Sequence, residues 1–206
     1  MKTIAVVGLV SMIAVSVIGS GAKEGRSCCA KSAENTAAPS SQVSGLSLYQ
    51  LDSTWTNDSG SALKLEAMRG RPQVVTMFFA QCNYACPLLV YQMQQIESAL
   101  PESLRGKVGF TLISFDTERD TPAALQVYRK GHGLDAQRWT LLRGSPEDVL
   151  DCAAVLNVKF KKDTQGQFQH SNVITLLNAD GEIVYQQLGL TADCNEMNKR
   201  VTDLLK

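Results

Sequence analysis

Two cysteines, Cys82 and Cys86, are separated by three residues and are followed directly by Pro87. They come after residues 74–79, a nearly continuous apolar run that predicts a strand buried on both faces, and before a run with helical spacing. The pair therefore lies at a strand-to-helix turn, where the helix N-terminus lowers the pKa of a nearby thiol. Because such a pair can form a disulfide or bind a soft metal, we expect the function to depend on one or both reactions.

A histidine far along the chain is predicted to face this pair. The chain contains two histidines; His132 lies in a loop that we expect to be exposed, and we assign it no role. His170 precedes residues 172–177, a predicted strand that would run antiparallel to the strand of residues 74–79 in a thioredoxin-like sheet. Its start then lies at the sheet edge that carries Cys82, an edge where ligand sites concentrate.

Cys82, Cys86 and His170 together offer two thiolates and one imidazole. Thiolate softness selects copper(I), while imidazole also suits copper(II). A structural zinc site normally takes four protein ligands, and the sequence shows no evident fourth ligand. The residues therefore favour copper as the metal.

The elements around these residues alternate between strands and helices. Buried parallel strands need crossover helices on their faces, and a final antiparallel hairpin with a helix completes a thioredoxin-like order. We therefore predict an α/β fold, thioredoxin-like, with a central mixed sheet flanked by helices and an N-terminal β-hairpin. The predicted elements are a hairpin of residues 46–51 and 62–65, strands at 74–79, 108–115, 172–177 and 182–185, and helices that begin at Pro87, Pro122, Pro146 and about Ala192, with Thr121 and Ser145 as caps.

The N-terminal sequence predicts a targeting signal. Residues 1–22 combine a basic start with an uncharged run, and Ser20 and Ala22 are the small residues that a signal peptidase reads. We predict a secretory signal cleaved after Ala22; the alternative is an uncleaved anchor, which would attach the chain to the inner membrane. Both place the rest of the chain in the periplasm or otherwise outside the cytoplasm. Residues 23–45 predict a flexible linker, and residues 46–206 form the predicted thioredoxin-like domain.

Composition narrows the function classes. The chain of 206 residues has 20 basic and 20 acidic residues and no basic block, so nucleic acid is not expected as a partner. About one domain follows the linker, long enough to bury a core without disulfides. We expect this domain to be a monomer.

Four further cysteines need an interpretation. Cys28 and Cys29 are adjacent in the linker and are interpreted as exposed thiols, with an accessory metal or thiol-exchange site as the alternative. Cys152 and Cys194 are each predicted to lie on the apolar face of a helix, as small core residues. The alternative is a disulfide between these two.

Three stretches of the chain resemble the Sco/SenC family of thioredoxin-like copper-binding assembly proteins. Residues 78–87 match its Cys-x-x-x-Cys-Pro, residues 114–122 match its Ser-x-Asp-Pro-Glu-Arg-Asp-Thr-Pro, and His170 with residues 173–184 matches its histidine-led strand and turn. Their order and spacing agree, from about Leu46 to the C-terminus. Two departures are the Asn-Tyr-Ala between the cysteines, which lacks the Pro-Asp common in the family, and a threonine in place of the family's first loop proline.

The resemblance implies that Cys82, Cys86 and His170 bind copper. It also implies a role in assembling the dinuclear copper site of cytochrome c oxidase, by delivering metal or by reducing the cysteines of the target. The implied partner is a copper-receiving protein such as an oxidase subunit. Asp116 would lie near the site and orient or tune a ligand, as carboxylates behind metal ligands do, or it would only cap its loop.

Two functions stay open on the sequence, so whether the chain is an enzyme stays open too. A copper metallochaperone needs the third ligand, His170. A thiol-disulfide oxidoreductase would use Cys82 as the attacking thiolate and Cys86 as the resolving one, yet no proline precedes the strand at 172–177, where thioredoxin-type enzymes hold substrate. A third and less favoured alternative is a thiol peroxidase or redox sensor on the same fold: peroxidases of this class need Thr-x-x-Cys, and Phe79 occupies the threonine position.

Overall fold

The computed structural model describes residues 47–191 and 193–206. The predicted signal peptide or anchor (1–22), the predicted linker (23–45) with Cys28 and Cys29, and Ala192 lie outside the described residues. Across the two described ranges, no helix has both the length and the apolar character needed to cross a membrane. The domain boundaries stay a prediction.

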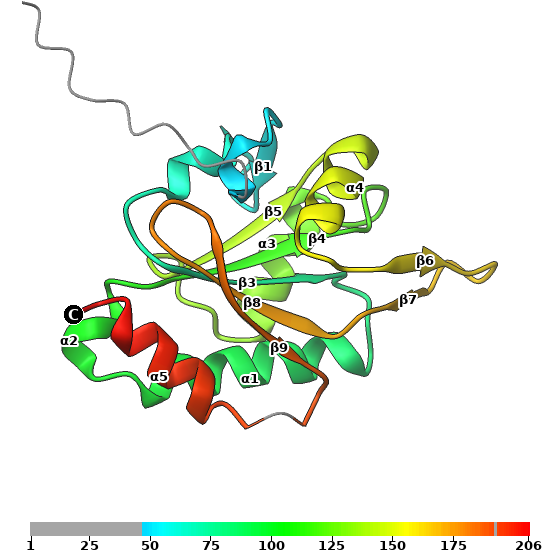
Figure 1. Cartoon of the computed structure of the whole chain (residues 1–206). Helices are drawn as coiled ribbons and strands as arrows, with labels where there is room; N and C mark the ends of the chain where they lie inside the picture. Colours follow the sequence, from blue (N-terminus) through cyan, green and yellow to red (C-terminus); the bar gives the residue numbers. More distant parts are fainter. Residues whose placement is uncertain (1–46, 192) are drawn as a thin grey trace, which may run out of the picture. The chain divides into compact units, whose positions relative to one another are not determined.

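The described chain is built around a mixed sheet in the order β2-β1-β5-β4-β3-β8-β9 (Figure 1). Strand β3 is parallel to β4 and antiparallel to β8, and β4 is parallel to β5. The predicted mixed, thioredoxin-like sheet is therefore confirmed. The strands are β1 (Trp55–Asn57), β2 (Ala62–Leu63), β3 (Gln73–Phe78), β4 (Gly109–Ser114), β5 (Trp139–Arg143), β6 (Phe160–Lys162), β7 (Phe168–His170), β8 (Val173–Leu177) and β9 (Ile183–Leu188).

Helices cover both faces of this sheet. Right-handed crossovers place α1 and α3 on one face, where Gln94 of α1 donates a 2.8 Å hydrogen bond to the carbonyl oxygen of His132 at the end of α3. Helix α5 contacts α1, whereas α4 lies on the other face (Figure 1). The helices are α1 (Ala85–Ala99), α2 (Glu102–Arg105), α3 (Pro122–Gly131), α4 (Pro146–Val155) and α5 (Asn195–Asp203), with short 3-10 turns at Leu48–Gln50 and Leu65–Met68.

Local signals fix two helix starts as predicted. The Thr121 hydroxyl accepts a hydrogen bond from the Ala124 N–H at the start of α3. Ser145 and Asp148 form a reciprocal capping box at the start of α4. Helix α1 begins at Ala85, two residues before the predicted start at Pro87, so Cys86 belongs to its first turn.

Larger differences from the sequence prediction concern the N-terminal hairpin, the last helix and β9. The N-terminal hairpin pairs β1 with β2, so its first strand begins at Trp55, whereas the predicted first strand (46–51) contains the 3-10 turn of Leu48–Gln50. Asn57 accepts the N–H groups of Ser59 and Ser61 in the tight turn between the two strands. The last helix begins at Asn195, because Asp193 accepts the N–H of that residue just before the helix. Strand β9 extends to Leu188, three residues beyond the predicted end.

A second, two-stranded sheet of β6 and β7 was not predicted. It extends from the body of the domain as a hairpin (Figure 1) and pairs Phe160 with His170. Phe160 stacks on Phe115 with ring centroids 5.1 Å apart, and Phe168 packs on Phe79 at 5.2 Å. These aromatic contacts hold the hairpin base against the ends of β3 and β4.

Candidate metal centre

The cysteine pair lies in the turn between β3 and α1. The Cys82 N–H donates a 3.2 Å hydrogen bond to the carbonyl oxygen of Phe79, which closes the turn. The Cys86 N–H, in the first turn of α1, donates to the Cys82 sulfur at 3.4 Å. Cys82 is half-buried and Cys86 is buried, so a partner in solution reaches the first sulfur more easily than the second.

His170 is the last residue of β7, and its ring faces the cysteines. Its Nε2 lies 3.6 Å from the Cys86 sulfur, and its Nδ1 lies 3.0 Å from the carbonyl oxygen of Ser171. Because a carbonyl oxygen only accepts, the proton of the neutral ring belongs on Nδ1, which leaves the Nε2 lone pair free to bind a metal. The rings of Phe115 (centroid at 5.2 Å) and Phe79 (6.3 Å, edge-on) fix the imidazole orientation.

The structure brings Cys82, Cys86 and His170 together as the sequence predicted. Their ligand atoms all lie within 4.8 Å of one another. Among the described residues, this is the one group of three metal-ligating side chains whose ligand atoms lie close enough to share an ion. Two ligands on opposite sides of one ion lie about 4–4.6 Å apart at bond lengths of about 2.0–2.3 Å. The three atoms therefore fit one ion after small adjustments.

The pKa values of the two thiols are shifted in opposite directions. The hydrogen bond from the Cys86 thiol lowers the pKa of Cys82 to about 4, and the N–H groups of Cys86 and Tyr84 act in the same direction, against the effect of burial. The same bond raises the pKa of Cys86, and burial adds to this rise. Cys82 is therefore the first thiolate, in the more accessible position.

Asp116, the predicted tuning residue, contacts Arg119 and not a cysteine or His170. Its carboxylate accepts hydrogen bonds from the Arg119 side chain and, at 3.2 Å, from the Arg119 N–H, so the alternative of a loop cap is present. The Arg119 guanidinium also donates to the carbonyl oxygen of Gly166, in the turn between β6 and β7. Asp116 therefore acts on the hairpin that carries His170 through an arginine.

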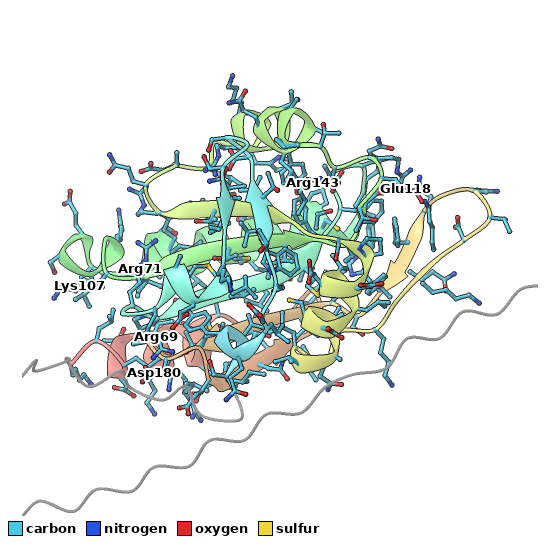
Figure 2. All side chains as sticks on the ribbon, turned by 90° about the horizontal axis from the view of Figure 1, so that it is seen from above. Arg69, Arg71, Lys107, Glu118, Arg143 and Asp180 are labelled. Carbon is cyan, nitrogen blue, oxygen red and sulfur yellow. The ribbon has the colours of Figure 1, made fainter. Side chains whose placement is uncertain are left out.

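Two further contacts join this loop to its surroundings. Arg143 donates a 2.7 Å hydrogen bond to the carbonyl oxygen of Thr117, and Glu118 forms an ion pair with Lys162 of β6 at 2.5 Å. Figure 2 shows Arg143 and Glu118 at the end of the molecule from which the hairpin extends, far from Arg69 and Asp180 at the other end. The loop of residues 116–120 is thus attached to the hairpin through Glu118 and Arg119 and to β5 through Thr117.

Asp120 was missed by the sequence analysis. Its buried carboxylate accepts hydrogen bonds from the Ala80 N–H at 2.9 Å and the Ser114 hydroxyl at 2.6 Å, and burial raises its pKa. Ala80 lies two residues before Cys82, so Asp120 holds the cysteine turn. The signal available was a second acidic residue four positions after Asp116, but nothing in the sequence identified its backbone partner.

Cys152 and Cys194 are both free thiols and form no disulfide. Cys152 is fully buried in α4, as expected for a small core residue, and burial raises its pKa. Cys194 lies just before α5 instead of on its apolar face, which corrects that part of the prediction. It still packs, half-buried, against the core, and its sulfur contacts the Gln92 carbonyl oxygen of α1 at 3.9 Å. Because α1 and α4 lie on opposite faces of the sheet, the two sulfurs are kept apart.

Comparisons with known proteins agree with this geometry. A family model described as SCO1/SenC matches residues 45–206. The SCO1 protein homolog of Bacillus subtilis (strain 168) is 23% identical over 142 residues, which cover 66% of this chain and 72% of that protein.

Two solved structures share the fold. ScoI of Bradyrhizobium japonicum with copper bound is similar with a TM-score of 0.63 and 23% identity, over 74% of this chain and 96% of that one. BsSco, a member of the Sco family of cytochrome c oxidase assembly proteins in which a disulfide switch was identified, is similar with a TM-score of 0.63 and 22% identity, over 73% and 90% of the two chains.

Proposed function

This chain belongs to the SCO1/SenC family, and from that premise we propose that it is a copper metallochaperone acting outside the cytoplasm. It binds copper(I) through Cys82, Cys86 and His170 and delivers it to the dinuclear copper site of cytochrome c oxidase. The observation that carries the proposal is the convergence of two sulfurs and a free imidazole nitrogen within 4.8 Å. The copper-bound relative and the oxidase-assembly relative support the choice of metal and target.

The chemistry of the donor set favours copper(I). Two thiolates select a soft ion, and the absence of a carboxylate from the cluster, within the described chain, disfavours hard ions such as magnesium and calcium. The imidazole also accommodates copper(II). Three ligands leave room for an incoming ligand of the receiving protein, so the ion is cargo that can be passed on.

The half-exposed position of Cys82 suits transfer. An incoming thiolate can approach the metal beside the half-buried Cys82, while His170 and the buried Cys86 still hold it. The aromatic rings of Phe79 and Phe115 limit water access from the far side of His170. The predicted signal peptide or anchor is the basis for placing this transfer in the periplasm.

A second function, thiol-disulfide exchange, is favoured by the acidities of the pair. The Cys82 thiolate attacks one sulfur of a substrate disulfide, forms a mixed disulfide and releases the other substrate sulfur as a thiolate. Cys86 then loses its proton and attacks the Cys82 sulfur, which releases the second substrate thiolate and leaves a Cys82–Cys86 disulfide. Two electrons pass to the substrate, whose copper-site cysteines become ready for metal.

Competition for copper tests the first function. The full chain is reduced and titrated with copper(I) against a chromogenic chelator, together with Cys82→Ser, His170→Ala and the control Cys194→Ser. We expect one tightly held copper per chain, weaker binding in the first two variants and no change in the control. Unchanged affinity in His170→Ala would remove the support for a three-ligand copper site.

A separate assay tests the second function. The reduced chain is mixed with an oxidised peptide that contains the two cysteines of an oxidase copper site, and peptide thiols are counted over time. Reduction lost in Cys82→Ser would support exchange. No reduction by the parent chain would leave metal delivery as the single function.

A further inference from the structure

An exposed apolar stripe runs along α1 beside the cysteine pair. Tyr84, Leu88 and Tyr91 are 74%, 38% and 58% exposed, and their spacing of four and three residues places them on one side of the helix. The apolar residues of α1 that point the opposite way and are buried in the core are Cys86, Leu89, Val90, Met93 and Ile96. The stripe is therefore not part of the packing of the domain.

The chain segment that contains this stripe carries no charge. Residues 73–96 contain no acidic or basic residue, and Gln81 and Asn83, which flank Cys82, are exposed and uncharged. Further along the same side, the helix presents Gln95 and then Ser98. The exposure of large apolar side chains is thus confined to the end of α1 that carries the cysteines. Exposed tyrosines without neighbouring charges are typical of the centre of a protein–protein interface.

The hairpin on the other side of the site carries two unpaired cations. Lys159 and Lys161 are exposed, and neither forms an ion pair with any residue in the described ranges. They flank Phe160, which pairs with His170, and they line a surface hollow together with that histidine. Figure 1 shows the base of this hairpin and the start of α1 at the same end of the domain.

We propose that Tyr84, Leu88 and Tyr91 form the docking surface for the protein that receives copper, and that Lys159 and Lys161 face acidic side chains at its margin. This rests on the proposed function. A receiving ligand must come within bonding distance of the metal at Cys82, so the surface that presents it must contact Tyr84, two residues away. The partner is thus a protein with thiol ligands in an uncharged apolar surface and acidic groups around it.

The two parts of this surface have different roles. The tyrosines and Leu88 lose water on docking and supply most of the binding free energy, as aromatic residues at the centre of interfaces do. The lysines lie at the margin, where charges mainly raise the association rate and lose their effect at high salt. Transfer to a small chelator needs neither part.

The test compares two acceptors. The full chain loaded with copper(I) is mixed with the reduced, metal-free dinuclear-copper domain of a cytochrome c oxidase subunit, or with a small chromogenic chelator, and both transfer rates are measured. The double variant Tyr84→Ser/Tyr91→Ser is compared with Val127→Ser, which removes an equally exposed apolar side chain (72%) on α3. We expect the double variant to slow transfer to the domain about tenfold or more, with the chelator rate and copper affinity unchanged.

The charges are tested in the same assay. Lys159→Glu/Lys161→Glu should slow transfer to the domain at low salt and approach the parent at high salt, whereas Lys107→Glu should have no effect. Parent-like transfer by the tyrosine variant would overturn the docking proposal. A second outcome would also overturn it: the parent chain forms a dimer, and the tyrosine variant is a monomer that transfers copper at the parent rate. The stripe would then bind a second copy of the chain and not the receiving protein. Failure of the parent to hold copper would instead contradict the proposed function, and with it the docking that rests on it.

Discussion

The carboxylate of Asp120 accepts a 2.9 Å hydrogen bond from the backbone N–H of Ala80, two residues before Cys82. The same oxygen accepts a hydrogen bond from the hydroxyl of Ser114 at the end of β4. One buried group thus joins the end of β4 to the turn that carries the cysteines. The position of the Cys82 sulfur therefore depends on Asp120, whose carboxylate accepts hydrogen bonds from Ala80 and Ser114 and not from a predicted metal ligand.

Removal of this acceptor should loosen the cysteine turn. In Asp120→Ala, the Ala80 N–H and the Ser114 hydroxyl lose their buried partner, and a hydrogen bond to a charged group contributes about 1.5–3 kcal/mol. We expect the free energy of unfolding to fall by about 2–4 kcal/mol. Copper(I) affinity should fall about tenfold, because loss of a group that positions metal ligands typically weakens metal binding by this factor or more. Urea denaturation and chelator competition measure the two effects.

Asp120→Asn is the matched control for this change. It keeps an oxygen that can accept both hydrogen bonds, so it should retain most of the stability and of the copper affinity. If Asp120→Ala bound copper as tightly as the parent, the turn would hold its shape without the carboxylate.

Arg119 links the loop after β4 to the hairpin that carries His170. Its guanidinium donates to Asp116 and to the carbonyl oxygen of Gly166, and it lies 5.9 Å from the centre of the Phe168 ring. Arg119→Ala should therefore let the hairpin open more often and weaken copper(I) binding several-fold. Because β6 and β7 form a sheet of their own, we expect the loss of amide hydrogen-exchange protection to be confined to residues 160–170.

The control for this variant is Arg200→Ala, which removes an exposed helical ion pair with Glu196. It should leave both hairpin exchange and copper affinity unchanged. Loss of protection across the whole sheet in Arg119→Ala would show a general loss of stability, and the hairpin link would then not explain the weaker binding.

How much of the fold could be predicted from the sequence depends on how far apart in the chain the contacting residues lie. Strands β3, β4 and β8 were predicted because each is a continuous apolar run, and the caps Thr121 and Ser145 because each bonds within three residues. The β6–β7 hairpin was not predicted, since its strands are short and rich in lysine and glutamine and are held by Phe115, 45 residues before Phe160 in the chain.

The candidate site shows the same division. Cys82, Cys86 and His170 could be placed together because the antiparallel pairing of β3 and β8 follows from the predicted fold. The roles of Asp120 and Arg119 at the site could not be predicted, since the contacts that give them these roles are to backbone groups 40 and 47 residues away. Backbone partners leave no signal in residue identity.

Cys82 should be the most reactive thiol of the described domain, down to acidic pH. The hydrogen bond from Cys86 lowers its pKa to about 4, against about 8.5 for a free cysteine, so it stays a thiolate as pH falls from 8 to about 5. We expect its alkylation rate by iodoacetamide to change little over this range. Peptide mapping by mass spectrometry measures each cysteine separately.

Cys194 is the internal reference for this measurement. Burial raises its pKa, so its alkylation should be slow and should fall steeply below pH 9. A Cys82 rate that fell in parallel with that of Cys194 would show that the lowered pKa of Cys82 is wrong.

Oxidation of the cysteine pair should abolish copper binding. A Cys82–Cys86 disulfide uses both sulfurs in a covalent bond and leaves His170 as a single ligand, and the metal requires thiolates. A mild oxidant such as oxidised glutathione accepts the two electrons and becomes two thiols as the disulfide forms. We expect the oxidised chain to hold no copper(I) against a chelator, and treatment with a phosphine reductant to restore one copper per chain.

Cys194→Ser should behave like the parent, whereas in Cys86→Ser oxidation could form no disulfide between residues 82 and 86. If the oxidised parent still held copper, its ligands would have to lie outside Cys82 and Cys86, and the site itself would be misplaced.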